Sequence, residues 1–125
     1  MEALILDASV LIGLLDTADV HHDRSIADVE AADREGRRLV LPASAYSEAL
    51  VAFARAGRLA DARRAILAMG VTVVPLTETI AEQAAELRAR HGKLRLPDAI
   101  VLATAREVGG KLLSYDRRLS GLARR

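Results

Sequence analysis

Short apolar runs alternate along the chain with longer segments rich in helix-forming residues. Four of these runs have the length and apolar character of strands buried on both faces. They cover residues 3–6, 39–41, 71–74 and 111–114, and they stop at Asp7, Pro42, Pro75 and Tyr115-Asp116. The pattern therefore predicts four short strands, the first of which ends at Asp7.

The intervening segments are dominated by Ala, Leu, Arg and Glu, and glycines stand where helices are expected to stop. The predicted helices span residues 10–15, 22–34, 43–56, 59–69, 77–90 and 97–108, with loops at 19–23 and 92–96. Strands that alternate with helices favour a parallel α/β sheet with right-handed crossovers.

Composition narrows the class of protein. Since 51% of the 125 residues are hydrophobic, residues 1–125 are expected to form a single domain around one core. The absence of cysteine excludes a disulfide scaffold, a thiolate metal site and a cysteine nucleophile, and makes the cytoplasm the expected location. No apolar stretch reaches the roughly 20 residues of a membrane span, so no membrane association is expected.

Four acidic residues are carried toward one edge of such a sheet. Ligands of open parallel α/β sheets bind outside the carboxyl ends of the strands. Asp7 ends the first predicted strand and Asp116 follows the last one. Asp98 opens the helix 97–108, whose positive end favours a carboxylate. Glu48 lies at the border of the buried face of its helix, where an acid needs a partner.

Each acid also has a purely structural interpretation. Asp7 could be a turn former, Glu48 a helix-edge residue, Asp98 a helix-start residue and Asp116 the N-cap of a short final helix. As a set, however, four acids on one edge repel one another unless cations neutralise them. Oxygen ligands favour Mg²⁺ or Mn²⁺ over Zn²⁺, and two such ions can hold both reacting oxygens of a phosphodiester. The set therefore indicates hydrolysis of a phosphate ester.

Four sequence motifs stand in order along nearly the whole chain. They are Leu4-Ile5-Leu6-Asp7-Ala8-Ser9, Ser47-Glu48, Leu96-Pro97-Asp98-Ala99-Ile100 and Leu113-Ser114-Tyr115-Asp116-Arg117-Arg118-Leu119. With these motifs the chain resembles a PIN domain, and in particular the VapC-type toxins of bacterial toxin-antitoxin pairs. The resemblance implies a three-layer α/β/α fold in which helices flank a parallel sheet of four or five strands. It also implies Mg²⁺- or Mn²⁺-dependent endoribonuclease activity.

Carried over position by position, the resemblance makes four residues the catalytic and metal-binding cluster: Asp7, Glu48, Asp98 and Asp116. It makes Ser9 and Ser114 polar supports of the carboxylates, and both stand two residues from a cluster acid, so a hydroxyl could fix its rotamer. Ser9 could equally be the N-cap of the helix 10–15.

The hypothesis that follows is hydrolysis of RNA by a metal-activated water, leaving a 5′-phosphate and a 3′-hydroxyl, with Asp7 and Asp98 as the main metal ligands. Metal-free ribonucleases commonly use His as acid and base, but His21, His22 and His91 stand at no predicted strand end.

An RNA substrate would be held mainly through its phosphates, because aromatic residues for base stacking make up only 2% of the chain. Arg117 and Arg118 could contact RNA phosphate or could form an exposed helix face. Leaving out the four cluster acids reduces 17 acidic residues to 13, against 18 basic ones, so the rest of the chain carries +5. This charge permits binding of a polyanion.

The resemblance also implies partners: a cognate VapB-like antitoxin that wraps the toxin, a second copy in a homodimer, and transfer or ribosomal RNA as substrate. Tyr46, Phe53 and the Ala-rich face of 43–56, together with 59–69, offer a surface for close helix contacts. Core packing would explain the same residues.

Two other functions are compatible with parts of the sequence. A catalytically silent PIN-like interaction module would share the fold, but it would be expected to have lost one of the four acids. A haloacid-dehalogenase-like phosphatase would use an Asp at the end of the first strand as nucleophile. Such an enzyme needs a second Asp two residues further on, where this chain has Ser9.

Overall fold

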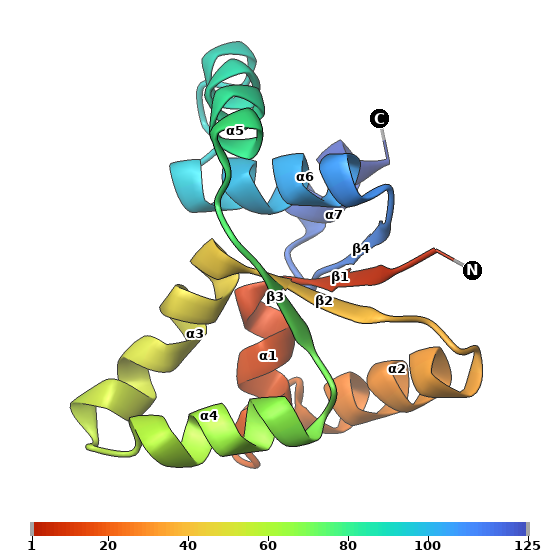
Figure 1. Cartoon of the computed structure of the whole chain (residues 1–125), viewed down its shortest axis with the longest axis vertical. Helices are drawn as coiled ribbons and strands as arrows, with labels where there is room; N and C mark the ends of the chain where they lie inside the picture. Colours follow the sequence, from red (N-terminus) through yellow and green to blue (C-terminus); the bar gives the residue numbers. More distant parts are fainter. Residues whose placement is uncertain (1, 125) are drawn as a thin grey trace.

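The computed structural model describes residues 2–124, and these residues form four strands and seven helices (Figure 1). In chain order the elements are β1 (Leu4–Leu6), α1 (Ala8–Leu15), α2 (His22–Arg34), β2 (Leu39–Pro42), α3 (Ala43–Arg55), α4 (Leu59–Ala68), β3 (Thr72–Val74), α5 (Glu78–Arg90), α6 (Leu96–Val108), β4 (Lys111–Leu113) and α7 (Arg117–Ala123). The predicted alternation of strands and helices is confirmed.

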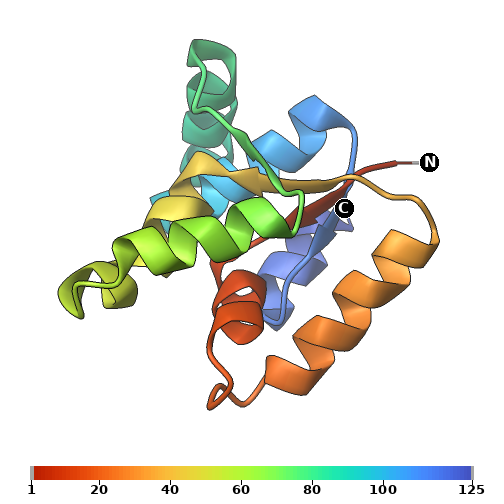
Figure 2. The ribbon, with the colours of Figure 1, turned by 60° about the horizontal axis from the view of Figure 1, so that its bottom comes forward.

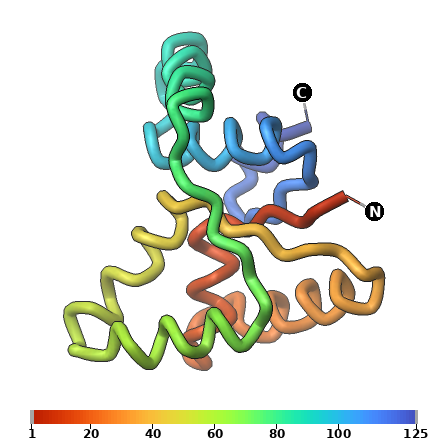
Figure 3. Tube along the Cα trace, in the orientation of Figure 1, coloured from red at the N-terminus to blue at the C-terminus, as the bar shows by residue number. Residues whose placement is uncertain are grey.

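The strands form one parallel sheet in the order β3-β2-β1-β4. The chain proceeds from β1 to β2 and then β3, and it returns through α5 and α6 to place β4 on the other side of β1 (Figure 3). The strand order therefore reverses beside β1. The carboxyl ends of β1 and β4 flank this reversal point, which is where open α/β sheets bind their ligands.

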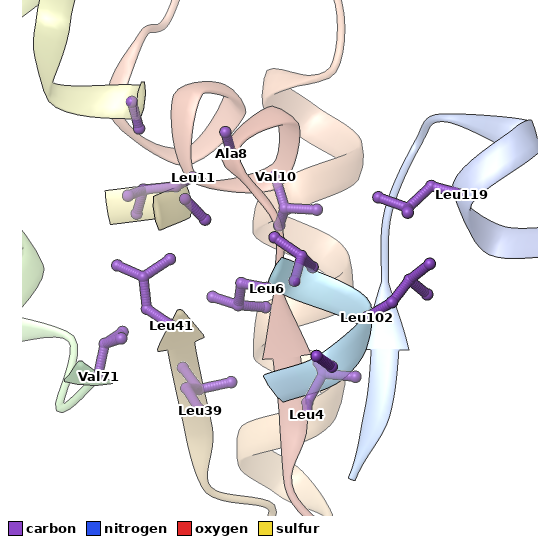
Figure 4. Close-up of a cluster of buried hydrophobic side chains, with 14 of the residues drawn as sticks. Leu4, Leu6, Ala8, Val10, Leu11, Leu39, Leu41, Val71, Leu102 and Leu119 are labelled. Carbon is purple, nitrogen blue, oxygen red and sulfur yellow. The ribbon is translucent and has the colours of Figure 1, made fainter. Parts of the chain in front are cut away.

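The two central strands are buried on both faces, which explains their uninterrupted apolar sequences. Ile5 and Val40 are fully buried and pack with Ala105 of α6. Leu6 points to the other face of β1 and joins a larger cluster that includes Leu11 of α1 (Figure 4). Full burial of each large side chain contributes about 1.5–3 kcal/mol. The core thus fixes the strand that carries Asp7.

Helices cover both faces of the sheet, as the three-layer prediction requires. In Figures 1 and 2, α5 and α6 lie on one side of the strands, and α1, α2 and α4 lie on the other. Within residues 2–124, no helix combines the length and the apolar character needed to cross a bilayer.

Some sequence predictions need correction. The runs at 71–74 and 111–114 are not buried on both faces, because β3 and β4 are the two edge strands of the sheet. Thr72 and Val73 are exposed in β3, and Lys111 is exposed in β4. The predicted loops 19–23 and 92–96 are shorter than expected, since α2 begins at His22 and α6 at Leu96. Pro97 is therefore the second residue of α6, and Arg95 is its N-cap.

Candidate active site

Asp7, at the end of β1, is the most buried of the four predicted site acids, with 6% of its surface exposed. It is the N-cap of α1, and one carboxylate oxygen accepts from the Val10 amide at 3.2 Å and from the Ser9 hydroxyl at 2.6 Å. The other oxygen accepts from the Ser114 hydroxyl. Burial of a carboxylate is costly unless such donors replace its water. Asp7 is therefore held in one orientation.

Ser114 joins Asp7 to Asp116. Its hydroxyl donates to Asp7 and also accepts from the Asp116 amide at 3.1 Å. The Asp116 carboxylate in turn caps α7 and accepts from the amides of Arg118 and Leu119 at 2.9 and 3.4 Å. The prediction that Asp116 could be the N-cap of the final helix is thus confirmed. Asp116 follows β4, so it lies at the same edge of the sheet as Asp7.

Ser9 lies inside α1 and does not cap it, because the helix begins at Ala8 and Asp7 occupies the cap position. Besides donating to Asp7, the Ser9 hydroxyl accepts from the Tyr115 amide at 3.4 Å. The two serines therefore connect the ends of β1 and β4 through the Asp7 carboxylate.

Tyr115 links the segment between β4 and α7 to α2. Its hydroxyl donates to Asp28 at 2.8 Å, the Arg24 guanidinium lies 4.3 Å from its ring centre, and the His21 ring lies 4.6 Å away. Burial raises the pKa of Tyr115 to about 12, and the bond to Asp28 acts in the same direction. The phenol therefore stays neutral. Its bond to Asp28 helps to hold Ser114 and Asp116, which flank Tyr115 in the chain, in place.

Glu48 and Asp98 face each other across Arg95. The Arg95 Nε lies 3.3 Å from Oδ2 of Asp98, and its Nη2 lies 3.3 Å from Oε1 of Glu48. These two carboxylates, Asp98 more than Glu48, raise the pKa of Arg95 above its usual value. The side chains of Arg95, Glu48 and Asp98 are 63%, 39% and 19% exposed. Ion pairs this exposed contribute about 0–1 kcal/mol, so this bridge is held weakly.

A cavity of about 460 Å³ lies at this edge of the sheet. Asp98 and Asp116 both line it, so it connects the start of α6 with the start of α7. Its lining also contains basic and imidazole side chains, namely His91, Lys93, Arg117 and Arg118. Asp7 and Glu48 are not part of this lining. The cavity therefore presents carboxylates and cations side by side, a combination suited to a phosphate that is also in contact with a metal ion.

The four acids do not form the expected compact cluster. In the part of the chain that the structure describes, no three acidic or histidine side chains are grouped so that they could hold a metal ion. Two contacts link the acids: Ser114 connects the Asp7 carboxylate to the backbone amide of Asp116, and Arg95 connects the carboxylates of Glu48 and Asp98. The oxygen donors still fit a hard divalent cation, and Arg95 shows that Glu48 and Asp98 accept a cation between their carboxylates.

Sequence reasoning assigned no role in the site to three residues at this edge: Arg95, Tyr115 and His91. Arg95 stands three residues before Asp98, a spacing that can form an ion pair at a helix start. The link between Tyr115 and Asp28 spans 87 residues, and no local signal could indicate it. His91 follows α5 and ends no strand, so only the packing of the chain brings it to the cavity.

The parallel sheet with helices on both faces and acids at its carboxyl edge defines a three-layer α/β protein. The sequence model of the PIN domain matches residues 4–125. The chain therefore belongs to the PIN domain family, as its motifs predicted. No curated protein sequence matches it.

Solved structures show the same fold. The chain is similar to Mycobacterium tuberculosis VapC20, described as a sarcin-ricin loop cleaving toxin, with 20% identity, a TM-score of 0.78, and 96% and 95% of the two chains covered. It is similar to a chain in a toxin-antitoxin complex from Klebsiella pneumoniae, with 24% identity, a TM-score of 0.76, and coverage of 91% and 87%. For FitAcB from Neisseria gonorrhoeae the identity is 18%, the TM-score 0.72, and the coverage 97% and 93%.

Proposed function

We propose that this protein is the toxin of a toxin-antitoxin pair and that it hydrolyses RNA with the help of Mg²⁺ or Mn²⁺. The observation that carries the proposal is the position of the four acids. Asp7 and Asp116 follow the two strands that flank the reversal of strand order, and Asp98 shares a cavity with Asp116. This edge is the ligand-binding edge of an open α/β sheet.

The carboxylates would divide the work according to how they are held. The sequence suggested Asp7 and Asp98 as the main metal ligands, but the Asp7 carboxylate already accepts three hydrogen bonds. Glu48 and Asp98, which already hold a cation between them, would therefore be the main ligands of the divalent ion, with Asp7 and Asp116 completing the site directly or through water. When bound, such an ion supplies an acidified water as nucleophile and neutralises charge on the phosphate. Ser9 and Ser114 would keep the Asp7 carboxylate in its rotamer.

RNA is the proposed substrate because basic side chains surround the carboxylates. Lys93, Arg117 and Arg118 line the cavity together with Asp98 and Asp116, and they could bind the phosphates on either side of the scissile one. One structural neighbour is described as cleaving the sarcin-ricin loop. A structured site in ribosomal or transfer RNA is therefore the substrate class to test first.

The exposed apolar residues on α3 and α4 indicate a surface that contacts another protein. In α3 only Ala45 and Ala49 are buried, whereas Val51 on α3 and Leu59 and Leu67 on α4 are 44%, 46% and 63% exposed. Core packing therefore explains the apolar residues in the first half of α3 but not the exposed Val51 in the second half. We assign this surface to contact with a second copy of the chain. The cognate antitoxin would cover the acidic edge, and one of the structural neighbours is described as a toxin-antitoxin complex.

Cleavage of total cellular RNA by the purified protein tests the nuclease. We expect discrete cuts in the presence of Mg²⁺ or Mn²⁺, none with EDTA, and none with Asp98→Asn. Fragment ends should carry a 5′-phosphate and a 3′-hydroxyl, since water is the proposed nucleophile. Cleavage that persists in EDTA, or that leaves a 2′,3′-cyclic phosphate, would exclude the proposed mechanism.

A catalytically silent interaction module is the second candidate. It is favoured by the absence of a three-ligand metal group within residues 2–124 and by the bridge that Arg95 forms between two of the acids. Calorimetry with Mn²⁺ separates the two functions. Binding that is lost in Asp98→Asn supports the nuclease, whereas no binding to the purified, antitoxin-free protein supports the silent module.

A further inference from the structure

The bridge between Glu48 and Asp98 is formed by a side chain of the protein itself. We propose that Arg95 is a built-in counter-ion that occupies this position in the ion-free protein and that must leave it before a divalent ion can bind there. The inference rests on the proposed function in one respect, the binding of a divalent ion to these carboxylates. It does not depend on which nucleic acid is cut.

The geometry shows why Arg95 acts as a bridging cation and not as a helix cap. Its backbone occupies the N-cap position of α6, yet its side chain makes no capping hydrogen bond. Within residues 2–124, the polar contacts of the guanidinium are one bond to Asp98, three residues ahead, and one to Glu48, 47 residues back. Two different nitrogens make these bonds, so one planar group connects α3 with α6.

The bridge is suited to displacement. The Arg95 side chain is long, 63% exposed and free to turn into solvent, and its ion pairs are weak in water. Carboxylate oxygens bind a small divalent cation more strongly than a delocalised monovalent one. A divalent ion and a guanidinium between the same two carboxylates would also repel each other, so the two cations exclude one another.

Competition of this kind has two consequences. In the ion-free protein, Arg95 lessens the repulsion between Glu48 and Asp98 and keeps the edge assembled. Arg95 also lowers the apparent affinity of the protein for a divalent ion, because part of the binding free energy is used to break the two ion pairs. By reciprocity, bound metal weakens the contact of Arg95 with the carboxylates to the same extent.

Calorimetric titration with Mn²⁺ tests the first consequence. Arg95→Gln should bind Mn²⁺ on the order of three- to tenfold more tightly than the unmodified protein, since two exposed ion pairs no longer compete. Arg90→Gln is the matched control, because it removes the same charge from the exposed end of α5, where Arg90 forms no ion pair with the described residues. Its affinity should change less than twofold. An equal gain in both variants, or no gain in Arg95→Gln, would overturn the proposal.

Nuclear magnetic resonance of the arginine side chains tests displacement without any reference to activity. The Nε–H signal of Arg95, assigned by its absence in Arg95→Gln, should shift on saturation with Mg²⁺. The Nε–H of Arg37, which donates to Glu35 at 2.8 Å, should stay in place and serves as the internal control. An Arg95 signal that does not move when Mg²⁺ is bound would contradict displacement.

The outcomes separate this inference from the proposed function. Tighter Mn²⁺ binding by Arg95→Gln without cleavage of any RNA would support the role of Arg95 as counter-ion and contradict the nuclease activity. Metal-dependent RNA cleavage with an unchanged Mn²⁺ affinity in Arg95→Gln would support the nuclease activity and contradict the role of Arg95. No Mn²⁺ binding to either protein would reject both.

Discussion

The carboxyl edge of the sheet holds its acids in two different ways. In one half, which we call the anchored half, Asp7 and Asp116 are joined by Ser114, and Asp7 is buried with hydrogen bonds to both oxygens. In the other, the open half, Glu48 and Asp98 are joined only by the exposed side chain of Arg95. The anchored carboxylates are parts of the fold, whereas the open ones remain available to another cation.

This difference predicts that substitutions in the two halves will differ in their effect on stability. Changes in the anchored half should lower the free energy of unfolding, because they leave buried donors without an acceptor. Changes in the open half should leave stability nearly unchanged and should affect metal binding and RNA cleavage.

The largest effect is expected for Asp98→Asn in the open half. Substitution of residues that only support metal ligands commonly costs 10- to 100-fold in activity, so loss of a ligand should reduce cleavage by about 100-fold or more. The amide keeps the shape of the side chain at the start of α6, and the free energy of unfolding should change by less than about 1 kcal/mol. RNA cleavage assays and urea denaturation measure the two quantities. Unfolding of the variant would show that Asp98 is structural.

The anchored half should respond to Asp7→Ala with a loss of about 2–3 kcal/mol in the free energy of unfolding. The change removes the cap of α1 and leaves two hydroxyls and one amide without their acceptor. Urea denaturation measures the loss. Glu48→Ala is the matched control, and its loss should stay below about 1 kcal/mol because its partner is exposed. Equal losses in the two variants would contradict the division.

A smaller loss, about 1–2 kcal/mol, is expected for Ser114→Ala. The buried hydroxyl donates to Asp7 and accepts from the Asp116 amide, and both bonds are removed. Ser120→Ala, which removes one partly buried bond from the same region, should cost less. Thermal unfolding compares the two variants. No difference between them would show that Ser114 does not couple the ends of β1 and β4.

The smallest effect, about 0.5–1.5 kcal/mol at neutral pH, is expected for Tyr115→Phe, which loses the bond to Asp28. The pKa of Tyr115 is raised from 10.0 to about 12 in the folded chain, so the unfolded chain releases this proton first. Stability of the unmodified protein should therefore fall between about pH 10 and pH 12, and Tyr115→Phe should lack this part of the fall. Parallel pH profiles of the two proteins would contradict the assignment.

Much of the fold could be predicted from local patterns in the sequence. The central strands were found to within a residue, since buried strands such as β1 consist only of apolar residues. The start of α6 was placed one residue late, because its N-cap is Arg95, a residue type that rarely caps helices. The exposure of β3 follows from its place at the sheet edge, which depends on the strand order and not on its own residues.

The acids of the site could also be predicted, but not the way in which they are held. Strand ends and helix starts are local features, and they bring Asp7 and Asp98 to one edge. The partner of Glu48 depends on how α3 and α6 pack against each other, and Arg95 lies 47 residues away in the chain. The sequence therefore indicated an acidic edge, and only the structure divides it into an anchored and an open half.

Diffraction from crystals of the protein soaked in Mn²⁺, with the anomalous scattering of the ion mapped, would locate the cation most directly. We expect a peak within coordination distance of carboxylate oxygens of both Asp98 and Glu48, with the Arg95 side chain turned toward solvent. A map without a peak at this edge, in which Arg95 still bridges the two carboxylates, would contradict a divalent-cation site there.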